Sequence, residues 1–271
     1  MTNAQVDLGV IGGSGLYSLL DQAASVPVRT PWGEPSAEVT VGLLAGRKVA
    51  FLPRHGADHR FPPHRIPYRA NMWALRSIGV RQVVTASAVG SLSAVLGPGE
   101  IVLPDQLIDK TWGRASTYND ADNGVAHVSL ADPYCSTGRA AAIRAAVGTG
   151  TTITSEGTLV VINGPRFSTR AESRDYQRSQ ATVIGMTAMP EASLARELAL
   201  CFTSLCLVTD LDAGVEAGHG VTHAEVMAAF AAKLPTLRDL LIATVAELPS
   251  EQGDCCCADV YEATAPPFEL P

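Results

Sequence analysis

The sequence predicts an α/β protein, and two observations lead to this prediction. Apolar stretches of strand length alternate along the chain with stretches whose apolar residues have helical spacing. Hydrophobic residues make up 46% and charged residues 17% of the 271 residues, which suffices for a sizeable core. No internal repeat and no linker divides the chain. We therefore expect one domain over residues 1–248, followed by an irregular tail over residues 249–271 that contains Cys, Pro and acidic residues.

The first half of the chain begins with an apolar strand that runs into the turn Gly12-Gly13-Ser14-Gly15. Two strands then flank a turn at Ala45-Gly46, and a helix follows whose apolar residues recur at every third position before Gly79 ends it. A further buried strand and a short one lead into a long polar connection. These elements are expected at residues 7–11, 39–43, 48–53, 70–78, 80–86, 100–103 and 105–132.

The second half opens with an alanine-rich helix and continues with buried strands. One strand leads into the turn Asn163-Gly164-Pro165, and another leads into Met186 and Thr187 before a helix. A third, unusually apolar stretch runs into Thr209 and the residues after it, as expected of a strand buried on both faces. A long amphipathic helix completes the domain. These elements are expected at residues 134–147, 158–162, a strand ending near 185, 188–198, 198–207 and 223–248.

The charge of the chain argues against nucleic acid as a partner, because the formal net charge is −7 and the isoelectric point is about 5.3. An anionic ligand would have to be held by local cations and backbone N–H groups. The first residues form no basic and apolar leader, and no uncharged stretch reaches the length of a membrane span. We therefore expect a cytoplasmic protein with no membrane partner.

The six cysteines are of two kinds. Cys201 and Cys206 lie in the apolar stretch and are expected to be core residues. Cys255, Cys256 and Cys257 are adjacent, lack the spacing of a zinc motif and have no histidine near them. We therefore expect reduced thiols on a surface segment and no metal site.

Three strand ends carry groups that suit a phosphate. The turn after the first strand offers backbone N–H groups and the Ser14 hydroxyl, although it matches neither a Walker loop nor a dinucleotide fingerprint. Arg54 and His55 offer a bidentate fork and a second donor. Ser87 lies where the next strand becomes rich in small and hydroxyl residues. Each group alone is also typical of an ordinary turn, but their convergence predicts an anion site.

Two carboxylates, Asp210 and Asp212, follow the apolar stretch and are separated by Leu211. Ligands of open α/β sheets bind at the carboxyl ends of strands. A carboxyl group in a partly dry cleft can remain protonated and act as an acid. Phe167, after another strand, could stack on a planar base. The alternatives are a solvated turn for the carboxylates and a core position for the ring.

An ordered set of motifs points to a family. They are Gly-Gly-Ser-Gly at 12–15, Pro-Arg-His-Gly at 53–56, Asn-Met-Trp-Ala-Leu at 71–75, Gly-Ser-Leu at 90–92, Pro-Asp-Gln-Leu-Ile-Asp at 104–109, Gly-Pro-Arg-Phe at 164–167, Met-Thr at 186–187, Pro-Glu at 190–191 and Thr-Asp at 209–210. This set resembles the trimeric purine nucleoside phosphorylases, most closely the 5′-methylthioadenosine phosphorylase branch, over residues 8–248. The resemblance implies a single α/β domain with a mixed central β-sheet flanked by helices, a homotrimer, phosphate as co-substrate, and no metal or organic cofactor.

The resemblance also implies roles for individual residues. Those that would hold phosphate are Ser14, Arg54, His55, Ser87, Ala88 and Thr187. Those that would contact the nucleoside are Phe167, Met186, Asp210, Leu211 and Asp212, with Met186 beneath the ribose and the two carboxyls as the catalytic pair. Ser168 and His223 fall where the branches differ in specificity, and His127 resembles a residue that a neighbouring subunit lends to the 5′ pocket.

The chemistry of phosphorolysis agrees with this set of residues. Charge builds on the leaving purine, so an acid at N7 and a fixed anion clamp beneath the sugar both lower the barrier. A carboxyl at Asp210 suits a 6-amino purine, because its oxygen accepts from the amino group and would clash with a 6-oxo group. We therefore expect a 6-amino purine nucleoside as the substrate, and the resemblance to the methylthioadenosine branch implies 5′-methylthioadenosine.

Two positions depart from that branch. Gly185 stands where it usually has Asn, and His223 stands where it is usually apolar. A His at the second position is what 6-oxopurine phosphorylases use to bind a ribose 5′-hydroxyl, so inosine or guanosine remain alternative substrates. A nucleoside-binding protein without catalysis and a hydrolase are the alternatives of other classes.

Overall fold

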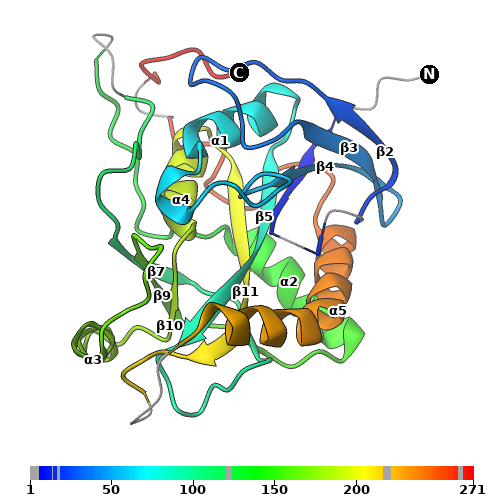
Figure 1. Ribbon diagram of the computed structural model, residues 1–271. Coiled ribbons are helices and arrows are strands. Elements are labelled where there is room, and N and C mark those ends of the chain that lie inside the picture. The colour runs from blue at the N-terminus through cyan, green and yellow to red at the C-terminus, as the bar shows by residue number, and fades with distance from the viewer. Residues whose placement is uncertain (1–5, 14, 17–18, 120–123, 216–220, 262–264) are drawn as a thin grey trace.

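The computed structural model describes residues 6–13, 15–16, 19–119, 124–215, 221–261 and 265–271 (Figure 1). Within these residues one mixed sheet of 11 strands forms the centre of the molecule. Its strands are β1 (Leu8–Gly12), β2 (Asp21–Val26), β3 (Val39–Leu44), β4 (Arg47–Pro53), β5 (Gln82–Ser91), β6 (Ile101–Val102), β7 (Gln106–Lys110), β8 (Ile153–Thr154), β9 (Thr158–Ile162), β10 (Val183–Gly185) and β11 (Cys201–Leu211). The expected fold class is confirmed.

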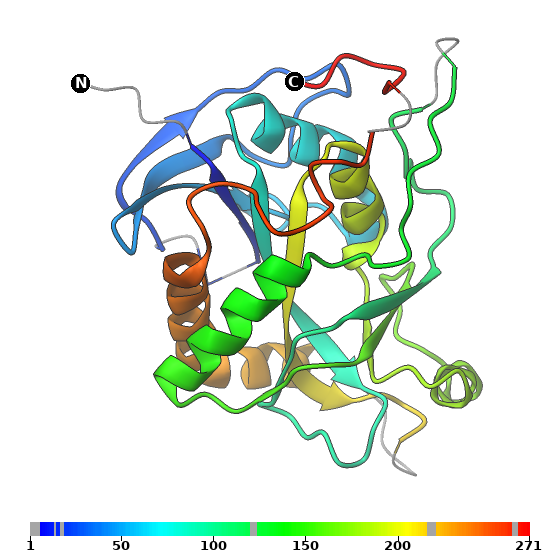
Figure 2. The same ribbon diagram turned by 180° about the vertical axis from the view of Figure 1, so that it is seen from behind.

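Helices cover both faces of this sheet. Their bounds are α1 (Tyr68–Ser77), α2 (Ser136–Thr149), α3 (Arg170–Arg178), α4 (Ala188–Glu197) and α5 (His223–Glu247). Helices α1 and α4 pack on one face, where Leu75 and Leu194 join a core with Ile11. Helices α2 and α5 pack on the other face, where Leu240 joins a core with Val10 (Figures 1 and 2). Strand β1 is buried on both faces, which explains why its residues are almost all apolar.

The sheet divides at β5, and this division positions the site. Residues 82–85 of β5 pair with β1 along one edge, while Gly90 and Ser91 pair antiparallel with β10. Between them, residues 86–89 have no partner strand on that edge among the described residues, because β11 pairs along the opposite edge. The unpaired edge exposes backbone donors and acceptors at the centre of the sheet, where a ligand can use them.

The structure corrects several boundaries expected from the sequence. Strand β5 continues past residue 86 to Ser91, and β11 continues to Leu211, so that Ser87 and Asp210 lie within strands. The first residues of the expected connection 105–132 form β7, which pairs with β9. Strand β2 and helix α3 were not predicted, because β2 is exposed and α3 is polar, with only Ser173 and Tyr176 buried.

The described part of the tail contains no helix or strand, but it packs closely on the domain. Phe268 lies against Trp73 and Tyr118, with ring centroids 5.9 and 5.6 Å away. Cys257 is buried and Cys255 is half-buried, so the expectation of surface thiols holds only for Cys256. None of the described helices combines the length and apolarity needed to cross a membrane.

Candidate active site

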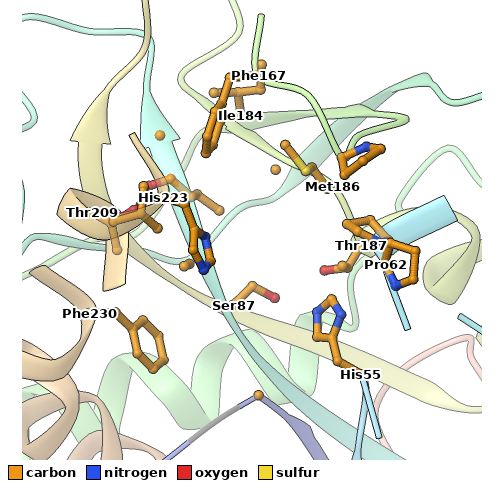
Figure 3. Close-up of a pocket in the computed structure, with 18 of the residues that line it drawn as sticks. His55, Pro62, Ser87, Phe167, Ile184, Met186, Thr187, Thr209, His223 and Phe230 are labelled. Atoms are coloured by element: carbon orange, nitrogen blue, oxygen red, sulfur yellow. Dashed lines mark hydrogen bonds between the residues drawn. The ribbon is translucent and has the colours of Figure 1, made fainter. Parts of the chain in front are cut away.

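A cavity of about 450 Å³ opens at the division of the sheet (Figure 3). The ends and edges of β4, β5, β10 and β11 supply its floor, and α5 and two loops supply its walls. Predicted site residues that line it are Arg54, His55, Ser87, Ala88, Phe167, Ser168, Met186, Thr187, Asp210, Asp212 and His223. The structure therefore brings together most of a set of residues that is scattered over the sequence.

Arg54 follows the end of β4 and is buried, with 2% of its surface exposed. Its Nε and Nη2 atoms donate to the carboxylate of Glu191 at 2.6 and 3.2 Å, and Nη1 donates to the carbonyl of Ala86 at 3.0 Å. Burial opposes the charge of Arg54, but the ion pair with Glu191 outweighs it and raises the pKa of the guanidinium. The guanidinium is thus a fixed charge whose orientation is set before any ligand binds.

His55 is the neighbour of Arg54 and also faces the cavity. Its Nδ1 lies 2.8 Å from the carbonyl oxygen of Phe61. A carbonyl only accepts, so Nδ1 carries the proton. Burial, followed by the charges of Arg54 and His59, lowers the pKa of His55 to about 4. The ring is therefore neutral at pH 7, and its Nε2 is an acceptor, not the second donor that the sequence suggested.

Hydroxyl groups surround the same end of the cavity. Figure 3 shows Ser87 and Thr187 on the same side as His55, with Ser87 on the unpaired edge of β5. Thr187 is the residue before α4, and its side chain makes no capping hydrogen bond. Ala88, which has only backbone groups to offer, is exposed on that edge. Ser14 lies outside the described residues, although its neighbour Gly13 lines the cavity.

Asp210 is placed by a bulge in β11. Val208 pairs with Val89 and Asp210 pairs with Gly90, so Thr209 is an extra residue in the strand. Bulges re-aim side chains and are frequent beside active sites. The Thr209 hydroxyl donates to Oδ2 of Asp210 at 2.8 Å. A side chain at Gly90 would come within 2.9 Å of Asp210 Oδ1, so this glycine leaves room for the carboxyl group.

Asp212 lies two residues further along and is buried. Its Oδ2 atom and the hydroxyl of Ser168 are buried and make no well-aligned hydrogen bond among the described residues, although Ser168, Ser173 and the backbone of Ala213 lie close enough to lower the pKa of Asp212. Buried polar atoms without hydrogen-bond partners are rare in folded proteins, and a bound ligand or water is one explanation for them. Both residues line the cavity, so these two atoms mark places where a ligand would complete the hydrogen bonds.

The two carboxyl groups share an environment that raises the pKa of both. Burial raises the pKa of Asp210, the nearby charge of Asp212 raises it further, and the hydrogen bond from Thr209 partly opposes these effects. Burial also raises the pKa of Asp212. A carboxyl with a raised pKa can donate a proton to a leaving group at neutral pH.

Phe167 stands on the side of the cavity opposite His55 (Figure 3). Its loop is fixed by the sequence that begins α3: Thr169 and Glu172 form a capping box, and Arg166 donates to both oxygens of Glu172. Arg114 holds the preceding turn, because its Nη2 donates to the carbonyl of Asn163 at 2.7 Å. The ring is therefore presented on a supported loop.

A further group of residues lines the cavity but was not predicted from the sequence, because such residues are equally typical of turns and of helix faces that bind no ligand. The loop that follows His55 contributes five of them and the first turns of α5 three: His59, Arg60, Phe61, Pro62, Pro63, Val226, Met227 and Phe230. The rings of His55 and His59 stack at 4.5 Å. The helical spacing of residues 223, 226, 227 and 230 could have indicated one face of α5, but spacing does not say what that face contacts.

Two predicted residues lie elsewhere. Leu211 pairs with Ser91 at the end of β11 and does not line the cavity. His127 is exposed in the connection between β7 and α2 and is also absent from the lining. Its role as a residue lent to a neighbouring subunit stays a prediction.

The fold is that of the phosphorylase superfamily. The sequence pattern of that superfamily matches residues 7–246, and the chain belongs to this family. The resemblance seen in the motifs is thereby confirmed.

Individual relatives are similar over nearly their whole length. A purine nucleoside phosphorylase of Streptomyces coelicolor is 54% identical, and the match covers 98% of both chains. An S-methyl-5′-thioadenosine phosphorylase of Mycolicibacterium smegmatis is 51% identical, and the match covers 97% of this chain and 99% of the relative. A methylthioadenosine phosphorylase from an Antarctic soil metagenomic library superimposes with a TM-score of 0.87 at 42% identity, covering 94% of this chain and 91% of the other. The enzyme of Schistosoma mansoni in complex with adenine superimposes with a TM-score of 0.84 at 35% identity, covering 89% and 91%.

Proposed function

We propose that the protein cleaves the N-glycosidic bond of a 6-amino purine nucleoside with inorganic phosphate, and that 5′-methylthioadenosine is its preferred substrate. The products are the free base and 5-methylthioribose 1-phosphate, so the activity is that of a pentosyltransferase. One observation carries the proposal: a single cavity has a fixed cation with hydroxyl groups at one end and two carboxyl groups with raised pKa at the other. The names of the relatives support the same reaction.

The cationic end suits phosphate. Arg54 has N–H groups left beyond its bonds to Glu191 and Ala86, and Ser87 and Thr187 add hydroxyl donors. Ser14, which lies outside the described residues, would add a third hydroxyl. Ala88 would act through its backbone N–H group. The acceptor Nε2 of His55 would accept a hydrogen bond from a phosphate P–OH group, which would orient the phosphate so that one of its other oxygens attacks the anomeric carbon. No organic cofactor takes part in this step.

The carboxyl end suits the purine. As the glycosidic bond breaks, negative charge develops on the base, and protonated Asp210 donates to N7. The buried carboxyl group of Asp212 can accept a hydrogen bond from the 6-amino group or help to keep the pair protonated. Phe167 would lie against the base, and Met186 would lie beneath the ribose. The positive charge that builds on the sugar in the transition state then lies between the base and the phosphate.

The structure offers arguments for two different groups at the 5′ position of the substrate, a methylthio group and a hydroxyl group. Val226, Met227 and Phe230 give α5 an apolar surface on the cavity, which favours a methylthio group. His223 lies on the same helix and is polar, which favours a 5′-hydroxyl. This residue supports a 6-oxopurine phosphorylase, acting on inosine or guanosine, as the second candidate; the Streptomyces coelicolor relative is a purine nucleoside phosphorylase by name.

Assembly and place in the cell are part of the proposal. We propose a homotrimer in the cytoplasm, with His127 of a neighbouring subunit completing the 5′ pocket. The connection between β7 and α2 that carries His127 is long for an idle loop in a compact domain. An active monomer in sedimentation experiments would contradict the trimer without affecting the proposed reaction.

The experiment is a comparison of kcat/KM for methylthioadenosine, adenosine, inosine and guanosine, with saturating phosphate and without phosphate. We expect base release only with phosphate, and the highest kcat/KM for methylthioadenosine. Release without phosphate would identify a hydrolase. Absence of release in both conditions, with nucleoside binding intact, would identify a binding protein. A preference for inosine or guanosine would select the 6-oxopurine alternative.

A further inference from the structure

Four cysteine side chains meet at the end of β11 that is remote from the cavity. Cys135 is the residue before α2, Cys201 begins β11, and Cys255 and Cys257 come from the tail. Their four sulfur atoms all lie within 4.8 Å of one another, and the Sγ atoms of Cys201 and Cys255 are 3.5 Å apart. Three of the thiols are buried and that of Cys255 is half-buried. Figure 2 shows the tail passing from α5 across the start of β11.

The spacing of these sulfur atoms fits a tetrahedral metal site. Zinc bound to four thiolates has Zn–S distances of about 2.3 Å, which require sulfur atoms about 3.8 Å apart. A disulfide instead joins sulfur atoms in separate pairs at about 2.05 Å. Here each sulfur atom has the other three as neighbours. We infer that Cys135, Cys201, Cys255 and Cys257 form a structural zinc site that binds one ion per chain.

The surroundings of the cluster suit a site of this charge. Four thiolates around Zn²⁺ carry a net negative charge, and N–H donors to sulfur stabilise it. The backbone N–H of Gly138 donates to Cys135 Sγ at 3.4 Å, and the amide Nε2 of Gln252, whose two hydrogens face carbonyl oxygens, lies 3.5 Å from Cys201 Sγ. With all four positions taken by protein ligands, no position is left for a substrate, so the ion has a structural role.

The site would fasten the tail to the domain. The described tail has no helix or strand, and its other polar anchors are individual hydrogen bonds at scattered positions. Arg47 and Gln82 donate to the carbonyl of Pro249, and the Tyr261 hydroxyl donates to the carbonyl of Glu197. Cys201 and Asp210 are nine residues apart along one strand, which is about 30 Å. Loss of the ion is therefore expected to affect stability before chemistry.

The sequence analysis predicted no zinc site because it considered only the spacing of cysteines within one segment of the chain. The four ligands come from three segments, and the triplet supplies its first and third members, whereas the middle one, Cys256, is exposed and outside the cluster. This makes Cys256 a matched control within the same triplet.

The experiment uses the full chain, purified under reducing conditions without chelators. Inductively coupled plasma mass spectrometry should find one zinc ion per chain in the wild type and in Cys256→Ser. Cys255→Ser and Cys257→Ser should lose most of the metal and lower Tm by more than about 5 °C. Chelation of the wild type should lower Tm in the same way, while the initial rate at low temperature changes little.

Cobalt titration of the reduced, metal-free wild type gives a second measurement that does not depend on variants. We expect intense sulfur-to-cobalt absorption together with the visible bands of tetrahedral cobalt, and both should be retained in Cys256→Ser. Protein with less than a tenth of an equivalent of zinc, and no such absorption on titration, would overturn the inference. Iron in place of zinc would overturn the identity of the ion. Mass spectrometry of protein purified in the presence of reductant provides a further test. Disulfides among these four cysteines would also overturn the inference.

Discussion

The two ends of the cavity differ in how a buried ionisable group is stabilised. At one end Arg54 is buried and its charge is matched by Glu191, which is equally buried. At the other end no Lys or Arg of the described structure is among the groups that shift the pKa of Asp210 and Asp212, and burial raises the pKa of both. A guanidinium keeps its charge, so burying it requires a counter-ion. A carboxyl group can instead take up a proton, so it can remain without one and serve as an acid.

The largest effect is expected from removing the matched cation. Arg54→Ala should lower kcat/KM for phosphate about 10²-fold or more, because charge-assisted hydrogen bonds are lost. It should also lower the free energy of unfolding by about 3–5 kcal/mol, since Glu191 is left buried and unpaired. Phosphate kinetics and denaturant unfolding measure the two effects.

A second variant separates these effects. In Arg54→Ala with Glu191→Ala, no charge remains unpaired, so part of the stability should return while use of phosphate stays poor. If the double variant regained use of phosphate, or if Arg54→Ala left the phosphate KM unchanged, Arg54 would not be a phosphate ligand.

The next largest effect is expected at the unmatched end. Asp210→Asn should lower kcat/KM for 6-amino nucleosides by about 10²–10⁴-fold, because the amide cannot transfer a proton to the departing base. Its amide can donate to a 6-oxo group, so the rate on inosine relative to adenosine should rise. Asp175→Asn, an exposed position on α3, is the matched control and should change neither value. An unchanged preference in Asp210→Asn would remove the main support for an adenine-type site.

The pH dependence of kcat/KM tests whether the protonated form of Asp210 is the active one. The pKa of Asp210 is raised, so the protonated form persists to higher pH than for an ordinary Asp. If the protonated form is the active one, kcat/KM for the nucleoside should fall as pH rises through that raised pKa, by about tenfold per unit above it. The falling limb should be missing in Asp210→Asn. A limb that persists in the variant would belong to another group.

A smaller effect is expected from crowding Asp210 without changing it. Gly90→Ala places a methyl group within 2.9 Å of Asp210 Oδ1 and 3.0 Å of Ile184 Cγ2. The carboxyl must shift, and we expect kcat to fall about tenfold, since small misplacement of an acid is costly. Gly185→Ala is the control, because its methyl group would meet only Leu159 and Val89 at 3.4 Å. Equal losses in both variants would mean that the packing of the cavity wall matters more than the carboxyl position.

Much of the site was predictable because it follows strands. Arg54 and His55 come directly after a recognisable apolar strand, and Asp210 ends another, so the rule that ligands bind at strand ends pointed to them. The loop with His59 and the α5 face with Phe230 were not predictable, because a proline-rich turn and an apolar helix face are equally typical of ordinary structure. Glu191 was visible only as part of a motif. Its pairing with Arg54 spans 137 positions in sequence, and no local pattern encodes such a contact.

The sequence by itself determined the α/β class, most of the strands and helices, and the chemical types of the groups at the strand ends, because hydrophobic periodicity and turn residues act locally. The tertiary structure decided which of those groups meet. The division of the sheet at β5 opens the cavity, the bulge at Thr209 aims Asp210, and four cysteines from three segments converge at the start of β11. Pairing of distant strands depends on packing across the whole chain, and for that reason only the folded molecule defines these neighbours.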